Sequence, residues 1–284
     1  GLTIVAMGTS APEVAASVAA ALSNAADMAI GNVYGSNVAN LALVGGICAL
    51  IRPINVTRFV LLRDIPIMLA VSLLLYLLFG NLTLGRMESI GMLFLFAGII
   101  FFMIRSERSI VQKDGQVQKE IEKTINHAVS HPPKTLWSSW LLVLIGLICL
   151  TVGADVAVKN AATLGRYAGL SDAVIGSTIL AIGTSLPELI TCLVAALKGH
   201  DDLSIGNLVG SNIFNTLLVL GIAGIAKPLV ISPRMVGMDF GLMMAISIIF
   251  SLLVLIFKRV NRPAGVILLF LYGLYMMYLF VVGR

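Results

Sequence analysis

The sequence GTSAPE at residues 8–13 recurs as GTSLPE at residues 183–188, and both copies lie inside long apolar segments. Each copy places a glutamate, Glu13 or Glu188, where charge is unfavourable, by roughly 2.5–3.5 kcal/mol at the centre of a membrane helix. The proline before each glutamate has no N–H, so the carbonyl four residues earlier loses its helical hydrogen-bond partner. A carboxylate, two hydroxyls and a free carbonyl in one hexapeptide predict hard oxygen ligands, which suit Na⁺ and Ca²⁺. We call these two hexapeptides the acid motifs.

The composition is that of a polytopic membrane protein. The mean hydropathy is +1.00, 58% of the 284 residues are hydrophobic and 12% are charged, which excludes an ordinary soluble domain. The net charge of +5 comes mostly from short loops, so it predicts no nucleic-acid partner. The three cysteines have unrelated spacings and predict neither a disulfide framework nor a zinc site. The expected surroundings are therefore the lipid bilayer.

Nine apolar segments are long enough to span a bilayer. They cover about 1–23, 28–51, 59–80, 87–105, 136–157, 173–198, 203–226, 237–257 and 263–282. A polar stretch between the fourth and fifth segments divides the chain into a first repeat (1–105), a linker (106–135) and a second repeat (136–284).

The two halves are copies of each other. Shifting the chain by 175 residues aligns Glu13 with Glu188, and 25 of the first 56 positions are then identical without a gap. The second repeat has a helix (136–157) before its acid motif and the first has none, so we expect an equivalent helix to precede Gly1. Two units of five spans each would insert in opposite directions. This all-α architecture of inverted repeats is typical of secondary transporters, whose ion sites lie near the bilayer midplane.

The distribution of basic residues predicts the orientation. If the linker 106–135 is cytoplasmic, thirteen lysines and arginines face the inner side and six face the outer side. This bias agrees with the positive-inside rule. We therefore expect a multi-pass protein of the cell (inner) membrane with a cytoplasmic linker.

A second motif follows each acid motif: GNVYGSNVAN at residues 31–40 and GNLVGSNIFN at residues 206–215, here called the amide motifs. In a helix Asn32, Ser36 and Asn40 lie on one face, and Gly31 and Gly35 allow another helix to approach closely. We therefore expect the two helices of each repeat to cross, with Glu13 facing Ser36 and Asn40. The second repeat would supply Glu188, Ser211 and Asn215 in the same way.

The candidate ligands are all oxygen donors. Their number exceeds the 6–8 oxygens that Ca²⁺ takes, and none is a Cys or His, so Zn²⁺ and copper are poor candidates. The two glutamates give a formal charge of −2, enough for one Ca²⁺ or two Na⁺ competing for the same ligands. For Asn32 and Asn207, hydrogen bonding between helices is at least as plausible as ion contact. Asp64 and Asp239 stand where a helix start would suit a capping role.

Through these motifs the chain resembles the sodium/calcium exchanger branch of the cation/calcium antiporter superfamily, whose two repeats carry G-T-S-x-P-E followed by G-N-x-x-G-S-N. The resemblance implies ten spans in the complete protein. It also implies a set of ligands around Glu13 and Glu188: Thr9, Ser10, Ser36, Asn40, Thr184, Ser185, Ser211, Asn215, and the backbone carbonyls of Ala6 and Ala181.

One position departs from the family pattern. Many members carry Asp where this chain has Asn215, so the number of Na⁺ exchanged and any transport of K⁺ stay open. The signature G-N-A-A-E, usual in the proton-coupled branch, is absent.

We expect an antiporter that exchanges Na⁺ for Ca²⁺ by alternating access, with these ions as substrates and no cofactor. The alternatives are a proton-coupled Ca²⁺ exchanger, since a glutamate can carry H⁺, and a passive cation channel. An enzyme is not expected, because a metal-activated water usually needs histidine or several carboxylates as ligands, and no apolar segment contains a histidine. The oligomeric state is open.

Overall fold

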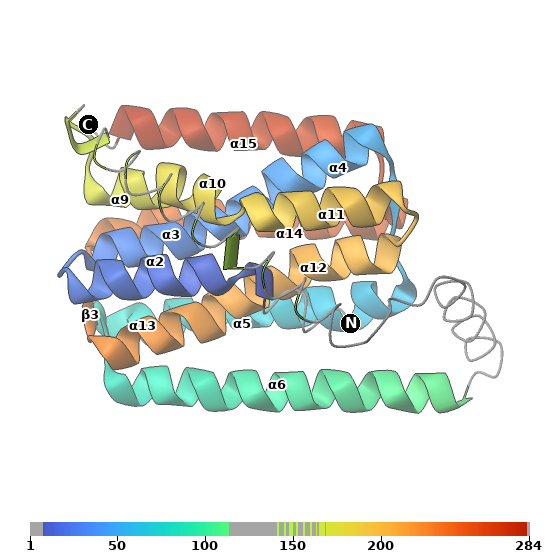
Figure 1. Cartoon of the computed structure of the whole chain (residues 1–284), viewed down its shortest axis with the longest axis horizontal. Coiled ribbons are helices and arrows are strands. Elements are labelled where there is room, and N and C mark those ends of the chain that lie inside the picture. The colour runs from blue at the N-terminus through green and yellow to red at the C-terminus, as the bar shows by residue number, and fades with distance from the viewer. Residues whose placement is uncertain are drawn as a thin grey trace.

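The computed structural model describes residues 8–113 and 169–282, together with some residues between 141 and 167. Its long elements are helices, and α6 and α15 run along opposite outer edges of the bundle (Figure 1). The predicted span 136–157 and the beginning of the span 1–23 lie largely outside the described residues.

The described residues of the first half form five α-helices, two π-helical segments, one 3₁₀ segment and two short strands. In chain order these are α2 (Ala11–Leu22), α3 (Ala26–Val38), the π segment η1 (Ala39–Val44), α4 (Gly45–Ile51), β1 (Ile54–Asn55), the π segment η2 (Val60–Asp64), α5 (Ile65–Leu78), the 3₁₀ segment η3 (Phe79–Asn81), β2 (Thr83–Leu84) and α6 (Arg86–Lys113).

The described part of the second half has a similar order. It consists of α9 (Asp172–Ile175), the π segment η4 (Gly176–Leu180), α10 (Ala181–Thr184), α11 (Leu186–Leu197), α12 (Asp201–Phe214), the π segment η5 (Asn215–Val219), α13 (Leu220–Ala226), β3 (Leu229–Val230), the π segment η6 (Met235–Asp239), α14 (Phe240–Phe257), β4 (Arg259–Val260) and α15 (Arg262–Val282).

Within the described residues, six helices are long and apolar enough to cross a membrane. They are Ala26–Ile51, Val60–Asn81, Arg86–Ser106, Asp201–Ala226, Met235–Phe257 and Arg262–Val281. The helix pair Asp172–Thr184 and Leu186–Leu197, bent by 41°, makes a seventh if it counts as one span. The bend precedes Pro187 by two residues, as expected from the lost hydrogen bond. A helical membrane protein is thus confirmed, and the count of nine spans remains a prediction.

Two of these spans form the interior of the bundle. In Ala26–Ile51 and Asp201–Ala226, 78% of the most apolar window is buried, against 22–39% in the other four spans. The two interior spans carry the amide motifs at equivalent positions. The outer spans present apolar side chains such as Phe94 and Phe270 outward, as a helix facing lipid does. The polar motifs are therefore kept inside the bundle.

The short strands connect the two halves crosswise. β1 of the first half pairs with β4 of the second, and β2 of the first half pairs with β3 of the second, both antiparallel. A shift of 175 residues carries β1 onto β3, and Leu84 of β2 onto Arg259 of β4. The shift that aligns the sequences therefore relates the β1–β4 pair to the β3–β2 pair.

Gly31 and Gly35 allow the close helix approach predicted from their spacing. A Cβ atom on Gly31 would lie 2.8 Å from Oγ of Ser177, and one on Gly35 would lie 2.6 Å from Cβ of Ala181. These contacts bring α3 of the first half against η4 and α10 of the second half, the elements that lead to Glu188. The glycines thus bring the first amide motif against the second acid motif.

Candidate ion-binding site

The two glutamates occupy equivalent and fully enclosed positions. Glu13 lies in the first turn of α2 and Glu188 in the first turn of α11, each directly after a proline. Proline is favourable there because the first turn needs no N–H from it, and the helix N-terminus favours a negative charge. Both side chains have 0% exposure. A buried charge of this kind needs close polar partners.

Those partners come from the opposite half. Ser10 Oγ donates to Oε1 of Glu188 at 3.0 Å, and Ser185 Oγ donates to Oε1 of Glu13 at 3.4 Å. Glu13 and Glu188 are also near enough to interact electrostatically. Each acid motif thus supplies a carboxylate to the site and a hydroxyl to the other motif's carboxylate.

Further hydroxyls surround the carboxylates. Thr184 lies beside Glu13, and its Oγ1 is 3.3 Å from Oγ of Ser36. Thr9 and Ser211 lie beside Glu188. Ser211 is thus near Glu188, but its Oγ makes no hydrogen bond within the described residues, and its role as a ligand remains a prediction. Ser36 has its hydrogen-bond contact with Thr184 of the other half.

Asn40 and Asn215 lie at the beginnings of two equivalent π-helical segments. η1 begins one residue before Asn40 and η5 begins at Asn215, and both side chains have 0% exposure. A π-helical turn within an α-helix is uncommon and frequently marks a functional site. Each π-helical turn thus begins where an amide motif ends, within the continuous spans Ala26–Ile51 and Asp201–Ala226.

Several enclosed oxygens have no hydrogen-bond partner among the described residues. Among them are Oε2 of Glu13, Oε2 of Glu188, Oδ1 of Asn40, Oδ1 of Asn215 and Oγ of Ser211, all in residues of the two motifs. Buried polar atoms in folded proteins are nearly always satisfied by protein, water or an ion. Carboxylate, amide and hydroxyl oxygens are the donors that Ca²⁺ accepts. The arrangement is therefore chemically suited to hold a hard cation as cargo.

The net charge of the enclosed region follows from its four buried carboxylates. Among the described residues the buried charged side chains are Glu13, Asp64, Glu188 and Asp239. Asp64 is 2.5 Å from Nε of Arg63, and Asp239 is 3.1 Å from Nε of Arg234. The two aspartates make no side-chain capping hydrogen bond, and their interaction with the helix dipole remains a prediction. Among the buried charges of the described residues, those of the two glutamates are therefore left for an ion.

The asparagines at the start of the amide motifs are hydrogen-bonding residues, as the sequence suggested. Asn32 Nδ2 donates to Oγ of Ser17 at 3.0 Å, and Asn32 Oδ1 accepts from Thr184 at 3.3 Å. Asn207 Nδ2 contacts Sγ of Cys192 at 3.3 Å, which is the equivalent contact because Cys192 aligns with Ser17. These bonds hold α2 against α3 and α11 against α12.

The backbone carbonyls of Ala6 and Ala181 are also predicted to bind the ion. Ala6 lies outside the described residues. The Ala181 carbonyl accepts the N–H of Ser185 at 3.1 Å and the hydroxyl of Thr184 at 3.4 Å, so it takes part in helical hydrogen bonding. Its role as an ion ligand therefore remains a prediction.

Sequence reasoning missed three features of the site. The exchange of serines between halves has no signal in the spacing of a single motif. The π-helical turns leave no periodic signal, although the abundance of asparagine near Asn40 and Asn215 marks the region. The ion pair of Asp64 had a visible signal, an arginine directly before it in an apolar segment. Arg234, five residues before Asp239, was a weaker signal of the same kind.

Comparisons with known proteins agree on one family. Residues 1–105 and 138–281 match the model of the sodium/calcium exchanger protein family. The chain is 30% identical over 309 residues to the sodium/calcium exchanger MaX1 of Methanosarcina acetivorans, covering 99% of this chain and 88% of MaX1. It is 37% identical over 254 residues to the inner membrane protein YrbG of Escherichia coli, covering 89% of this chain and 77% of YrbG.

A solved structure shows the same fold. The sodium-calcium exchanger NCX_Mj, soaked with 2.5 mM Na⁺ and 0.1 mM Ca²⁺, superposes with a TM-score of 0.73 at 27% identity. The match covers 98% of this chain and 85% of that chain. The chain, a multi-pass membrane protein with a cation/calcium antiporter's motifs, belongs to the sodium/calcium exchanger family.

Proposed function

We propose that this protein exchanges Na⁺ for Ca²⁺ across the membrane by alternating access. The observation that carries the proposal is the reciprocal bonding of the acid motifs: Ser10 contacts Glu188, and Ser185 contacts Glu13. One enclosed cage therefore draws on both halves of the chain. A movement of one half relative to the other would change the cage as a whole.

The chemistry of the cage supports competition between the two ions. Glu13 and Glu188 carry a formal charge of −2, which one Ca²⁺ or two Na⁺ can balance. Described residues include no cluster of three or more His, Cys, Asp or Glu side chains, so neutral oxygens must provide most of the coordination. Asn40, Asn215 and Ser211 offer such oxygens. Because both loads need the same carboxylates, binding of one ion displaces the other.

The remaining ligands of the proposed cage are hydroxyls and backbone oxygens. They are Thr9, Ser10, Ser36, Thr184, Ser185 and the carbonyls of Ala6 and Ala181. The hydroxyls also orient the carboxylates, as the bonds of Ser10 and Ser185 illustrate.

The proposed topology has nine spans in this chain, arranged as inverted repeats at 1–105 and 136–284. The crosswise strand pairs support it, because β1 with β4 and β3 with β2 are related by the repeat. We place the linker 106–135 on the cytoplasmic side of the inner membrane. Arg52 contacts Ala196 near one end of the bundle, where β4 also lies, and Lys227 contacts Asn24 near the other. Thirteen basic residues on one side against six on the other favour this orientation.

The coupling ion is tested by flux measurements on the purified chain in proteoliposomes. An outwardly directed Na⁺ gradient should drive accumulation of ⁴⁵Ca²⁺, and collapsing that gradient with a Na⁺ ionophore should abolish it. Uptake driven equally by a pH gradient without Na⁺ would instead establish a proton-coupled exchanger. Calcium flux independent of any counter-ion would establish a channel. The names of MaX1 and NCX_Mj favour the first outcome.

A further inference from the structure

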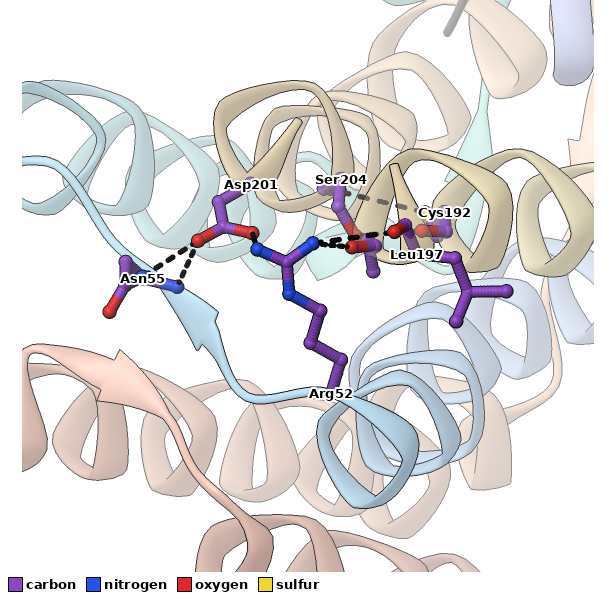
Figure 2. A network of polar contacts seen from close by, with 7 residues as sticks. Arg52, Asn55, Cys192, Leu197, Asp201 and Ser204 are labelled. Atoms are coloured by element: carbon purple, nitrogen blue, oxygen red, sulfur yellow. Dashed lines mark hydrogen bonds and ion pairs between the residues drawn. The ribbon is translucent and has the colours of Figure 1, made fainter. Parts of the chain in front are cut away.

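The segment after α4 lies beside the turn that joins α11 to α12 in the other half, and Arg52 reaches that turn (Figure 2). Arg52 Nη1 donates to the carbonyl oxygens of Ala196 at 2.5 Å and of Leu197 at 3.5 Å, at the end of α11. Its Nη2 lies 3.9 Å from the carboxylate of Asp201, the first residue of α12. The main-chain N–H and the side-chain amide of Asn55 donate to the other oxygen of Asp201 at 3.2 Å and 2.7 Å. One guanidinium thus joins the ends of two helices.

These contacts suit the chemistry of a helix end. The last carbonyls of a helix have no partner within it, and the helix C-terminus attracts positive charge. The planar guanidinium has several donors and can bind carbonyls and a carboxylate together. Gly199, in the turn, has a φ of +84°, and a Cβ there would lie 3.2 Å from Nη1 of Arg52. The absence of a side chain at this position gives the arginine room to approach.

The opposite end of the bundle has a similar arrangement with different chemistry, although its aspartate, Asp27, aligns with Asp202 and not with Asp201. Lys227, which aligns with Arg52, donates to Oδ1 of Asn24 in the turn between α2 and α3. The main-chain N–H of Ser232 donates to the carboxylate of Asp27 at 3.1 Å. Here the basic side chain meets a neutral amide, whereas Arg52 meets two carbonyls and a carboxylate.

The two ends also differ in packing. A cavity of about 510 Å³ lies at the Lys227 end, and Ala21, Asn24, Asp27, Lys227 and Ser232 are among the residues that line it. Ala21 and the aligned Ala196 are both buried, at 1% and 0% exposure, but Ala21 borders this cavity whereas the carbonyl of Ala196 is covered by Arg52. The Lys227 end is therefore hollowed next to Ala21.

We propose that Arg52 is a positioning residue. It keeps the ion site inaccessible from the end of the bundle at which Arg52 lies. α11 carries Glu188 and α12 carries Ser211, so joining their ends restrains both ligands. Opening toward the Arg52 end then requires release of the carbonyls of α11 and of Asp201. Lys227 is the weaker counterpart at the other end. This inference rests on the proposed alternating access.

Two matched cysteine reporters test the proposal. Ala21→Cys and Ala196→Cys lie at equivalent positions and are introduced separately into the full chain carrying Cys48→Ala, Cys149→Ala and Cys192→Ser. The protein is held in lipid nanodiscs, which expose both ends, and its reaction with a soluble maleimide is timed without Na⁺ or Ca²⁺. We expect the cysteine at 21 to react faster than that at 196.

The substitution Arg52→Gln should raise the reaction rate at position 196 and lower it at position 21. We expect the ratio of the two rates to change about tenfold, which corresponds to about 1.4 kcal/mol. Asp201→Asn should act in the same direction. Lys227→Gln, the matched control, should shift the ratio in the opposite direction by a smaller factor.

An unchanged ratio in Arg52→Gln would overturn the proposal. A rise of both rates together would also overturn it, because it would show that the arginine merely stabilises the fold. The labelling requires no transported ion. If the reporters behave as expected but a Na⁺ gradient drives no Ca²⁺ uptake, the positioning role stands and the proposed exchange activity fails.

Discussion

Removing the Ser10 hydroxyl tests whether one half of the chain sets the ion affinity of the other half's carboxylate. Ser10 is 1% exposed, and its Oγ lies 3.0 Å from Oε1 of Glu188. A hydrogen bond to a charged group contributes about 1.5–3 kcal/mol, which corresponds to roughly a 10- to 150-fold change in affinity. We expect Ser10→Ala to weaken Ca²⁺ binding at least about tenfold. Ser185→Ala should have the smaller effect, because its bond to Glu13 is longer, at 3.4 Å.

The assay is equilibrium binding of ⁴⁵Ca²⁺ to the purified full chain, with thermal unfolding measured in parallel. The control is Ser72→Ala, because Ser72 is also buried but donates to the carbonyl of Met68 within α5, at 2.8 Å. The control should bind Ca²⁺ as the unaltered protein does. The reasoning is refuted if Ser10→Ala binds within twofold of the unaltered protein, or if Ser72→Ala weakens binding as much.

Three further changes have distinct expected outcomes. Glu188→Gln removes a charge with little change of shape and should abolish Na⁺-driven Ca²⁺ uptake in proteoliposomes while the protein stays monodisperse; persistent uptake would exclude Glu188 as a ligand. Asn215→Asp adds a carboxylate and should lower the half-saturating Ca²⁺ concentration or alter the Na⁺:Ca²⁺ ratio; if neither changes, Asn215 is not a ligand. Gly35→Ala places a Cβ 2.6 Å from that of Ala181 and should destabilise the fold by about 1–3 kcal/mol. Gly98→Ala, with nothing within 4 Å, should leave the unfolding temperature nearly unchanged, and equal shifts would contradict the packing argument.

The features that sequence predicted well are those with a strong local signal. A glutamate in an apolar segment is unfavourable enough to stand out, and its recurrence at Glu188 marks an equivalent site. Gly31 and Gly35 indicated a close helix approach because small residues four apart lie on one face. The six helices long enough to span a membrane follow the predicted apolar segments within a few residues.

The features that sequence did not predict depend on contacts between the halves. Ser10 reaches Glu188 rather than Glu13, and no spacing within one motif encodes a partner 178 residues away. The turns at Asn40 and Asn215 are π-helical, a change of backbone hydrogen bonding that hydrophobic periodicity does not record. Arg52 looked like an ordinary loop arginine until the end of α11 was found beside it.

The claim that the two halves share one ion is tested most directly by locating the ion itself. Crystals of the full chain soaked with Sr²⁺, a heavier substitute for Ca²⁺, would give an anomalous peak at each bound cation. The account predicts one peak between α2 and α11 with carboxylate oxygens of both Glu13 and Glu188 among its ligands, at about 2.3–2.6 Å for Ca²⁺ itself and slightly longer for Sr²⁺. A peak bound by only one of these glutamates, or by neither, would contradict it.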